Sequence, residues 1–153
     1  DRTLVGASDA GAHMDMIDTF AFATVMLEKG VREHKVISLE EAVYQLTHRL
    51  AKYMGLRDRG LLKTGYHADI VVFDAATVGR APTYARYDVP GNQYRLYSEA
   101  HGVDHVFVNG VQIIKDAAHT GKLPGKVLRS GKDTVTVPIG AMREGRIADF
   151  AAE

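Results

Sequence analysis

The dipeptide Asn109-Gly110 constrains the fold of this sequence more than any other feature, because it separates two runs of β-branched residues. A two-residue type I′ turn requires positive φ at both central positions, and Asn followed by Gly accepts those angles readily. The flanking runs, Val103–Val108 and Val111–Lys115, have strand-forming compositions. The pattern therefore predicts a β-hairpin. Another strand is expected at Ala68–Asp74, which contains Ile-Val-Val.

The first half of the chain has helical periodicity instead. Asp18–His34 carries apolar residues over a wide arc, which is typical of a helix that packs on more than one side. Ser38 and Glu41 form a capping-box pattern just before apolar residues at three- and four-residue steps. Gly55 stands where the C-terminal glycine of that helix belongs. A helical half followed by a β-rich half predicts an α+β chain.

A single strand is expected before the helices, at Thr3–Ala7, and it leads into a loop of small and polar residues. One strand has no sheet to join unless partners lie earlier in a longer chain. The sequence also lacks an initiator Met, so we expect it to be a fragment of a larger protein. At the other end, a short strand over 134–139 and a helix after residue 141 are expected.

Composition excludes several classes of protein. Nineteen basic residues balance nineteen acidic ones, and no basic cluster stands out, so no nucleic-acid partner is expected. Apolar residues make up 46% and charged residues 25%, which is typical of a globular chain. Cysteine is absent, which excludes disulfides and thiolate ligands within the chain. No apolar run is long enough to cross a membrane and the start does not resemble a signal peptide, so no membrane partner and a cytoplasmic location are expected.

Several segments, in a consistent order, resemble one family. The first is Gly-Ala-Ser-Asp-Ala-Gly-Ala-His at 6–13. The second is Ala-Asp-Ile-Val-Val-Phe-Asp at 68–74, with Arg59-Gly60 before it, and the third is Val-Phe-Val-Asn-Gly at 106–110. Together with Thr-Gly…Pro-Gly…Leu-Arg over 120–129, they resemble the C-terminal end of the amidohydrolase superfamily, within its D-aminoacylase group. Leu50 departs from the family pattern, which often has a proline there.

The resemblance implies the last strand and helices of a TIM-like (β/α) metal-dependent hydrolase barrel, followed by part of a small β-sandwich domain. We accordingly expect residues 1–57 to end the barrel, 58–131 to belong to the sandwich and 132–153 to form a tail. The implied activity is hydrolysis of the amide bond of N-acyl-D-amino acids, with zinc in the full-length protein. Relatives hold zinc with residues upstream of this last strand, so this chain alone is expected to hold no zinc and to be inactive.

Asp9 is the main candidate site residue. From the residues alone, a loop aspartate can equally be a turn or helix-cap residue. The resemblance implies that Asp9 is catalytic, contacts the metal region and acts as base for a metal-activated water. Ser8 is a candidate substrate neighbour rather than a nucleophile, because the Gly-x-Ser-x-Gly spacing is not met. His13 is a candidate substrate contact, with a loop histidine bonded to backbone as the alternative.

Other polar and aromatic residues receive structural interpretations. Asp15 and Asp18 are interpreted as solvated loop or helix-start charges. Four tyrosines between residues 84 and 97 are interpreted as covering the edge of a core within a connecting segment.

Two alternative functions stay open. One is a member of the same superfamily that acts on cyclic amides, of the hydantoinase or dihydropyrimidinase type. The other is a non-catalytic β-rich oligomerisation module. Because the barrel-derived segment would lack its partners, we also expect self-association through residues before Leu56, with the β-rich half holding the stable core.

Overall fold

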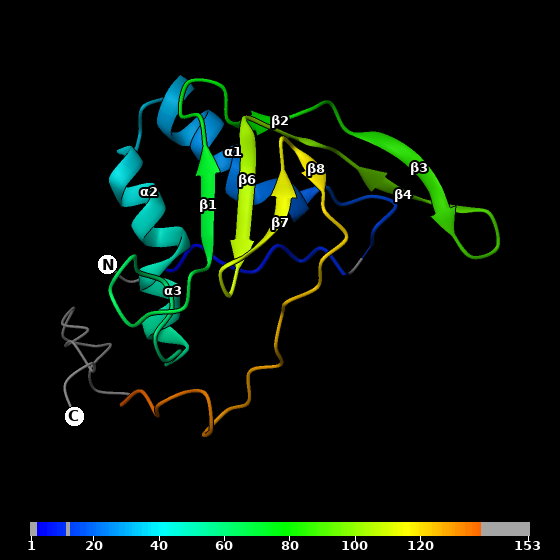
Figure 1. The fold of residues 1–153 in the computed structure, drawn as a ribbon. Coiled ribbons are helices and arrows are strands. Elements are labelled where there is room, and N and C mark those ends of the chain that lie inside the picture. Colours follow the sequence, from blue (N-terminus) through cyan, green and yellow to red (C-terminus); the bar gives the residue numbers. More distant parts are fainter. Residues whose placement is uncertain (1–2, 12, 139–153) are drawn as a thin grey trace.

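The computed structural model describes residues 3–11 and 13–138 of the chain. Helices occupy the first third of these residues, and antiparallel strands follow (Figure 1). This order confirms the α+β class. No helix within the described ranges is both long enough and apolar enough to cross a membrane.

The predicted helix over 18–34 is present as a continuous helical run with three geometries. It consists of the 3₁₀ turn η1 (Thr19–Ala21), the helix α1 (Phe22–Val25) and the π-helical η2 (Met26–Glu33). Wider π turns are uncommon and are often found next to functional sites. Leu27 is the buried residue of η2.

The second predicted helix is divided in two, α2 (Leu39–Leu46) and α3 (His48–Tyr53). The Ser38 side chain caps α2 by accepting a 3.1 Å hydrogen bond from the backbone N–H of Glu41. Thr47 interrupts the run with φ −126° and ψ −89°, and its hydroxyl donates back to the carbonyl of Val43 at 2.6 Å. A β-branched residue whose hydroxyl bonds the preceding turn in this way disfavours a regular helix. The sequence pattern did not predict this break.

Gly55 ends α3 as predicted. Its φ is +64°, its N–H donates to the carbonyl of Lys52 at 3.0 Å, and the N–H of Leu56 donates to the carbonyl of Ala51 at 2.8 Å. These two bonds define a Schellman motif, in which the left-handed position favours glycine.

Four strands form the main sheet, in the order β1-β6-β7-β8 and all antiparallel. Their bounds are β1 Ile70–Phe73, β6 Val103–Val108, β7 Val111–Lys115 and β8 Ala118–His119. The predicted hairpin is confirmed to the residue, with φ of 50° at Asn109 and 78° at Gly110. Helix α1 lies behind β1 and β6 in Figure 1.

Two smaller strand pairs lie between β1 and β6 in the sequence. Strand β2 (Gly79–Arg80) pairs with β5 (Ala100–His101), and β3 (Tyr84–Val89) pairs with β4 (Gln93–Tyr97). The β3–β4 hairpin projects away from the main sheet in Figure 1. The interpretation of its tyrosines as part of a connecting segment is therefore wrong. Their rings pair across the hairpin, Tyr84 with Tyr97 at 5.9 Å and Tyr87 with Tyr94 at 5.7 Å between centroids.

The main hydrophobic core lies between the helices and the strand half. Its buried residues are Leu27, Ala42 and Val78, from η2, α2 and the turn before β2. Phe73 and Val103 pack against this cluster from the main sheet. The expectation that the β-rich half holds the core by itself is wrong, because that half contributes one face and the helices contribute the other.

The segment Thr3–Ala7, which is expected to be a strand when partners precede it, has no strand partner among the described residues. The segment is not part of any sheet there. It runs instead from beside α3 toward the base of the β3–β4 hairpin (dark blue in Figure 1). A strand needs a neighbour to satisfy its backbone groups, and none is available here.

Of the predicted strand over 134–139, the structure describes residues 134–138, and these form a single antiparallel bridge, between Thr134 and Leu56. The N–H of Val135 donates to the carbonyl of Gly55 at 2.8 Å, so the segment after β8 returns to the end of α3. The expected helix after residue 141 lies outside the described residues. The domain boundaries at 57/58 and 131/132 stay predictions.

Candidate functional site

The candidate residues Ser8, Asp9 and His13 lie on one loop, which spans residues 8–17 and connects the extended N-terminal segment to η1. Backbone conformation in and just before this loop is unusual. The φ angles of Ala7, Asp9 and His13 are 64°, 52° and 48°. Left-handed φ at non-glycine residues is uncommon, and such residues cluster at functional sites.

Neighbouring residues hold the start of this loop in place. The backbone carbonyl of Ser8 accepts a hydrogen bond from the hydroxyl of Thr19, and its side-chain oxygen accepts one from the N–H of Ala10 at 3.3 Å. Just before it, Gly6 is packed so closely on α3 that a Cβ at this position would be 3.2 Å from Cδ2 of Leu50. Ser8 thus acts as an anchor for the loop.

The carboxylate of Asp9 is exposed between these anchors. His13 is also exposed, and its carbonyl accepts hydrogen bonds from the N–H groups of Met16 at 2.9 Å and Ile17 at 2.8 Å. The structure therefore brings the three predicted site residues onto one short loop. It leaves the Asp9 carboxylate accessible to a small molecule.

Asp18 lies at the end of the loop and the start of η1, where a helix-start charge is expected, and its partly exposed side chain also forms an ion pair. Its Oδ2 accepts from Arg80 Nη1 at 2.5 Å and from the hydroxyl of Thr83 at 3.1 Å. The hydrogen bond from Arg80 is the main reason that the pKa of Asp18 lies below its ordinary value. Asp18 therefore fixes the end of the loop to the β2 region.

The described residues do not assemble a metal centre. No group of three or more His, Cys, Asp or Glu side chains comes together within residues 3–11 and 13–138. A catalytic zinc site takes three protein ligands and a water, and one exposed carboxylate does not meet that requirement.

A pocket of about 280 Å³ lies between the 8–17 loop and the β3–β4 hairpin, and its lining includes Ala10, the residue after Asp9. The loop side contributes Ala10, Met14 and Ile17, and Phe20 of η1 completes it. The strand side is lined by residues from the end of β4 and just after it, Arg95, Leu96, Tyr97 and Ser98. A 2.7 Å hydrogen bond from the N–H of Leu96 to the carbonyl of Met14 joins the two sides.

The strand side of this pocket was not predicted from the sequence. A usable signal was present, because Pro90-Gly91-Asn92 separates two stretches in which tyrosines recur. Such a turn between short β-favouring runs is typical of a hairpin. The structure confirms the turn, with φ of 78° at Gly91 and 57° at Asn92.

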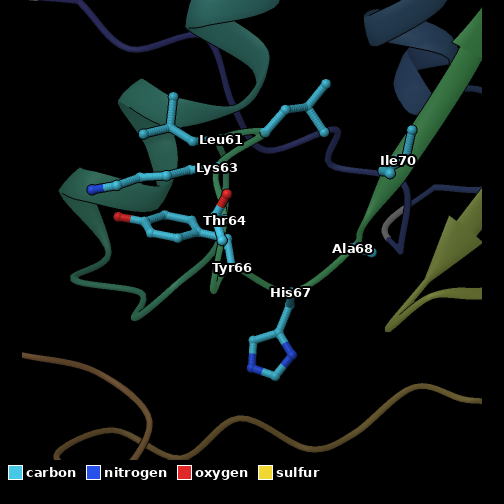
Figure 2. A pocket seen from close by; sticks show the side chains of 8 residues that line it. Leu61, Lys63, Thr64, Tyr66, His67, Ala68 and Ile70 are labelled. Carbon is cyan, nitrogen blue, oxygen red and sulfur yellow. The ribbon is translucent and has the colours of Figure 1, made fainter.

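A second pocket, of about 250 Å³, lies on the segment between α3 and β1. Figure 2 shows Lys63 alongside the ring of Tyr66, with the imidazole of His67 pointing in a different direction, downward in this view. The Lys63 ammonium is 5.3 Å from the Tyr66 ring centroid. This pocket shares no residue with the one that Ala10 lines, and its lining comes from residues 61–70, which include none of the candidates Ser8, Asp9 and His13. We therefore do not assign the chemistry to it.

Comparison with known proteins gives this loop its context. The model of the amidohydrolase family matches residues 2–114, which is well over half of the sequence. The chain therefore belongs to the amidohydrolase family.

Two individual relatives of the chain are deacylases of N-acyl-D-amino acids. The chain is 39% identical over 109 residues to the N-acyl-D-aspartate deacylase of Alcaligenes xylosoxydans xylosoxydans, which covers 71% of this chain and 20% of that enzyme. It is 37% identical over 131 residues to the N-acyl-D-glutamate deacylase of the same organism, covering 86% of this chain and 24% of the relative. The chain thus spans about a fifth to a quarter of the length of these relatives.

A solved structure agrees with these sequence relatives. The fold resembles that of a D-aminoacylase with a TM-score of 0.52 and 34% identity, over 65% of this chain and 19% of that one. Another D-aminoacylase structure, with the same TM-score and identity to this chain, is of an enzyme with a binuclear metal centre.

Proposed function

We propose that this sequence is the C-terminal portion of a metal-dependent amidohydrolase that hydrolyses the amide bond of N-acyl-D-amino acids. The observation that supports the proposal is the exposed carboxylate of Asp9, held on a left-handed loop within the region that matches the family. The deacylase names of the relatives supply the substrate class.

The extended segment before Asp9 fits the last strand of a TIM-like barrel. In such barrels the chemistry takes place where strands end and loops begin, and Asp9 stands at such an exit. The strand would acquire its hydrogen-bonding partners from the four-fifths of the relatives' length that this sequence does not span. A β-sandwich would be completed in the same way, from the main sheet β1-β6-β7-β8.

Asp9 is assigned the proton transfers of amide hydrolysis. Its carboxylate accepts a proton from the attacking water and then donates it to the nitrogen of the leaving amine. The amide nitrogen leaves readily as an amine only once it is protonated. The two proton transfers, from the water and to this nitrogen, are therefore steps of the same reaction.

The metal is assigned to the parent protein and not to this chain. The described residues bring together no group of three or more His, Cys, Asp or Glu side chains. They therefore fit neither a binuclear nor a complete mononuclear centre. Zinc, with ligands from the part of the relatives outside this sequence, is the metal that we propose.

A chimera tests this function directly. This sequence replaces the matching segment of the N-acyl-D-glutamate deacylase, and hydrolysis of several N-acyl-D-amino acids and their L-enantiomers is measured. We expect turnover of the D-substrates and a loss of about 100-fold or more in kcat for Asp9→Asn. Asp15→Asn, an exposed carboxylate on the same loop, is the matched control and should retain activity.

Two results would contradict the proposal. One is a folded chimera that hydrolyses none of the D-substrates. The other is an Asp9→Asn chimera that remains as active as the Asp15→Asn chimera. Turnover of cyclic amides in place of N-acyl-D-amino acids would favour the hydantoinase-type alternative.

A further inference from the structure

The pocket between the 8–17 loop and the β3–β4 hairpin is close to the proposed catalytic group. Ala10, which lines it, is the residue directly after Asp9 in the sequence. A ligand whose scissile bond reached the Asp9 carboxylate would therefore have one end within range of this pocket.

The charged group at the pocket is already neutralised. The guanidinium of Arg95 forms a bidentate pair with Asp88, through two hydrogen bonds of 2.7 Å each. Its other side lies over the ring of Tyr97, 5.0 Å from the centroid. A bidentate pair uses the donor geometry with which arginine would otherwise bind a carboxylate. Arg95 is thus poorly placed to attract an anionic ligand.

Ser98, a second polar residue of the lining, is also engaged. The hydroxyl of Ser98 donates to the carbonyl of Ala81 at 2.7 Å. Most other lining residues are apolar: Ala10, Met14, Ile17, Phe20 and Leu96. Apolar residues therefore make up most of the lining, although Arg95, Tyr97 and Ser98 contribute polar surface as well. One apolar residue is a flexible methionine, Met14, which is 42% exposed.

We propose that this pocket binds the acyl chain of the N-acyl substrate. The inference depends on the proposed function for the identity of the ligand. An N-acyl amino acid carries its carboxylate on the amino-acid side of the scissile amide, whereas the acyl side is uncharged whatever the amino acid. A pocket lined mostly by apolar residues, whose one arginine is already paired with Asp88, fits the acyl side. At about 280 Å³ it lies near the lower limit of ligand pockets, which suits a short or medium straight chain.

Binding to the full 153-residue chain tests the inference without requiring catalysis. The probes are N-acetylglycine, N-butanoylglycine and N-octanoylglycine, and the observable is the NMR signal of labelled methionine methyl groups. We expect affinity to rise about fourfold for each added methylene until the pocket is full. The methyl signal of Met14, assigned by its loss in Met14→Leu, should shift, and that of Met16 should not.

A matched pair of neutral substitutions locates the site. Met14→Gln places a polar group at the pocket and should weaken binding of N-octanoylglycine by about three- to tenfold, while leaving N-acetylglycine unaffected. Met16→Gln is the control, because Met16 is 69% exposed on the same loop and does not line the pocket. Unchanged far-UV circular dichroism shows that both variants fold.

Three results would overturn the inference. The first is affinity that does not depend on acyl length. The second is an equal loss of binding in Met14→Gln and Met16→Gln. The third is equally tight binding of N-acetyl-D-2-aminooctanoate, which would place the amino-acid side chain in the pocket. Failure here with an active chimera would refute the acyl pocket alone, and acyl binding by a chain whose chimera is inactive would refute the proposed function alone.

Discussion

The backbone N–H of Asn109 donates a 2.8 Å hydrogen bond to Oδ1 of Asp69, although 40 residues separate them in the sequence. Arg59 bonds the other carboxylate oxygen of Asp69, and its Nη2 donates to the side-chain oxygen of Asn109 at 3.0 Å. The Asn109 side chain in turn donates to the carbonyl of Pro124 at 2.8 Å. The family-like residues at 59, 69, 109 and 124 therefore form one network that fixes the β-hairpin against the segment after α3.

Replacing Asp69 with Asn should lower the stability of the chain at neutral pH by about 1–3 kcal/mol, because two donors lose a charged acceptor. Partial burial raises the pKa of Asp69, but the bonds from Asn109 and Arg59 outweigh it and the net pKa is lowered. Such a group stabilises the fold above the ordinary aspartate pKa of about 3.9, and that contribution is lost as pH falls through the lower folded pKa.

Urea unfolding of wild type and Asp69→Asn at pH 7 and at pH 3 measures this effect. The difference between the two proteins should be largest at pH 7 and smaller at pH 3. Asp104→Asn serves as control, since Asp104 is exposed on β6 and should change stability by less than about 0.5 kcal/mol. A difference for Asp69→Asn that grows in acid would contradict the assigned role.

Gly60 should tolerate substitution less well than Gly65. Both have left-handed φ, at 82° and 89°, so alanine at either position should cost about 1–2 kcal/mol of backbone strain. A Cβ on Gly60 would also lie 2.6 Å from Cβ of Ala51 on α3, whereas a Cβ on Gly65 would meet nothing within 4 Å. The clash should add about 1–3 kcal/mol to the effect of Gly60→Ala. Urea unfolding of the two variants is the measurement, and equal destabilisation would show that the close packing on α3 is unimportant.

Local chemistry explains which elements the sequence predicted well. The Asn109-Gly110 turn and the cap at Ser38 depend on residues within a few positions of each other, so their patterns are complete in the sequence. The break at Thr47 accompanies a bond from its hydroxyl to the carbonyl of Val43, which a threonine within a helical pattern does not by itself predict. The conformation of Thr3–Ala7 depends on strand partners, which no local pattern contains.

The candidate site was also predicted only in the part that the local sequence marks. The family resemblance singles out Asp9, and its catalytic role stays a prediction. Ser8 and His13 lie on the same loop because they are close to it in the sequence. The other side of the adjacent pocket comes from Arg95 and Tyr97, more than 80 residues later in the sequence. The two sides of the pocket are joined by the hydrogen bond between Leu96 and Met14. Hydrophobic periodicity does not predict a bond between residues so far apart in the sequence.

The chain alone should retain no stoichiometric zinc after mild dialysis. It should also fail to hydrolyse N-acyl-D-amino acids when zinc is added, because Asp9 alone can neither hold the metal nor polarise the carbonyl. Metal analysis and a hydrolysis assay of the purified chain test both points. Retained zinc at one equivalent, or turnover that disappears in Asp9→Asn, would show that the chain forms a complete site.

Self-association through the helical half is the final prediction. Val43, Tyr53 and Met54, on or next to α2 and α3, are 37%, 42% and 61% exposed. Covering each 100 Å² of such apolar surface contributes about 2.5 kcal/mol, so a second copy of the chain would gain from contact there. We expect dimers or larger species in sedimentation velocity at micromolar concentration, and a shift toward monomer for Met54→Lys. Leu123→Lys is the control, since Leu123 is 89% exposed in the segment after β8 and lies outside this surface. A wild-type chain that sediments as a monomer at these concentrations would refute the prediction, and an equal effect of the two lysine variants would place the contact elsewhere.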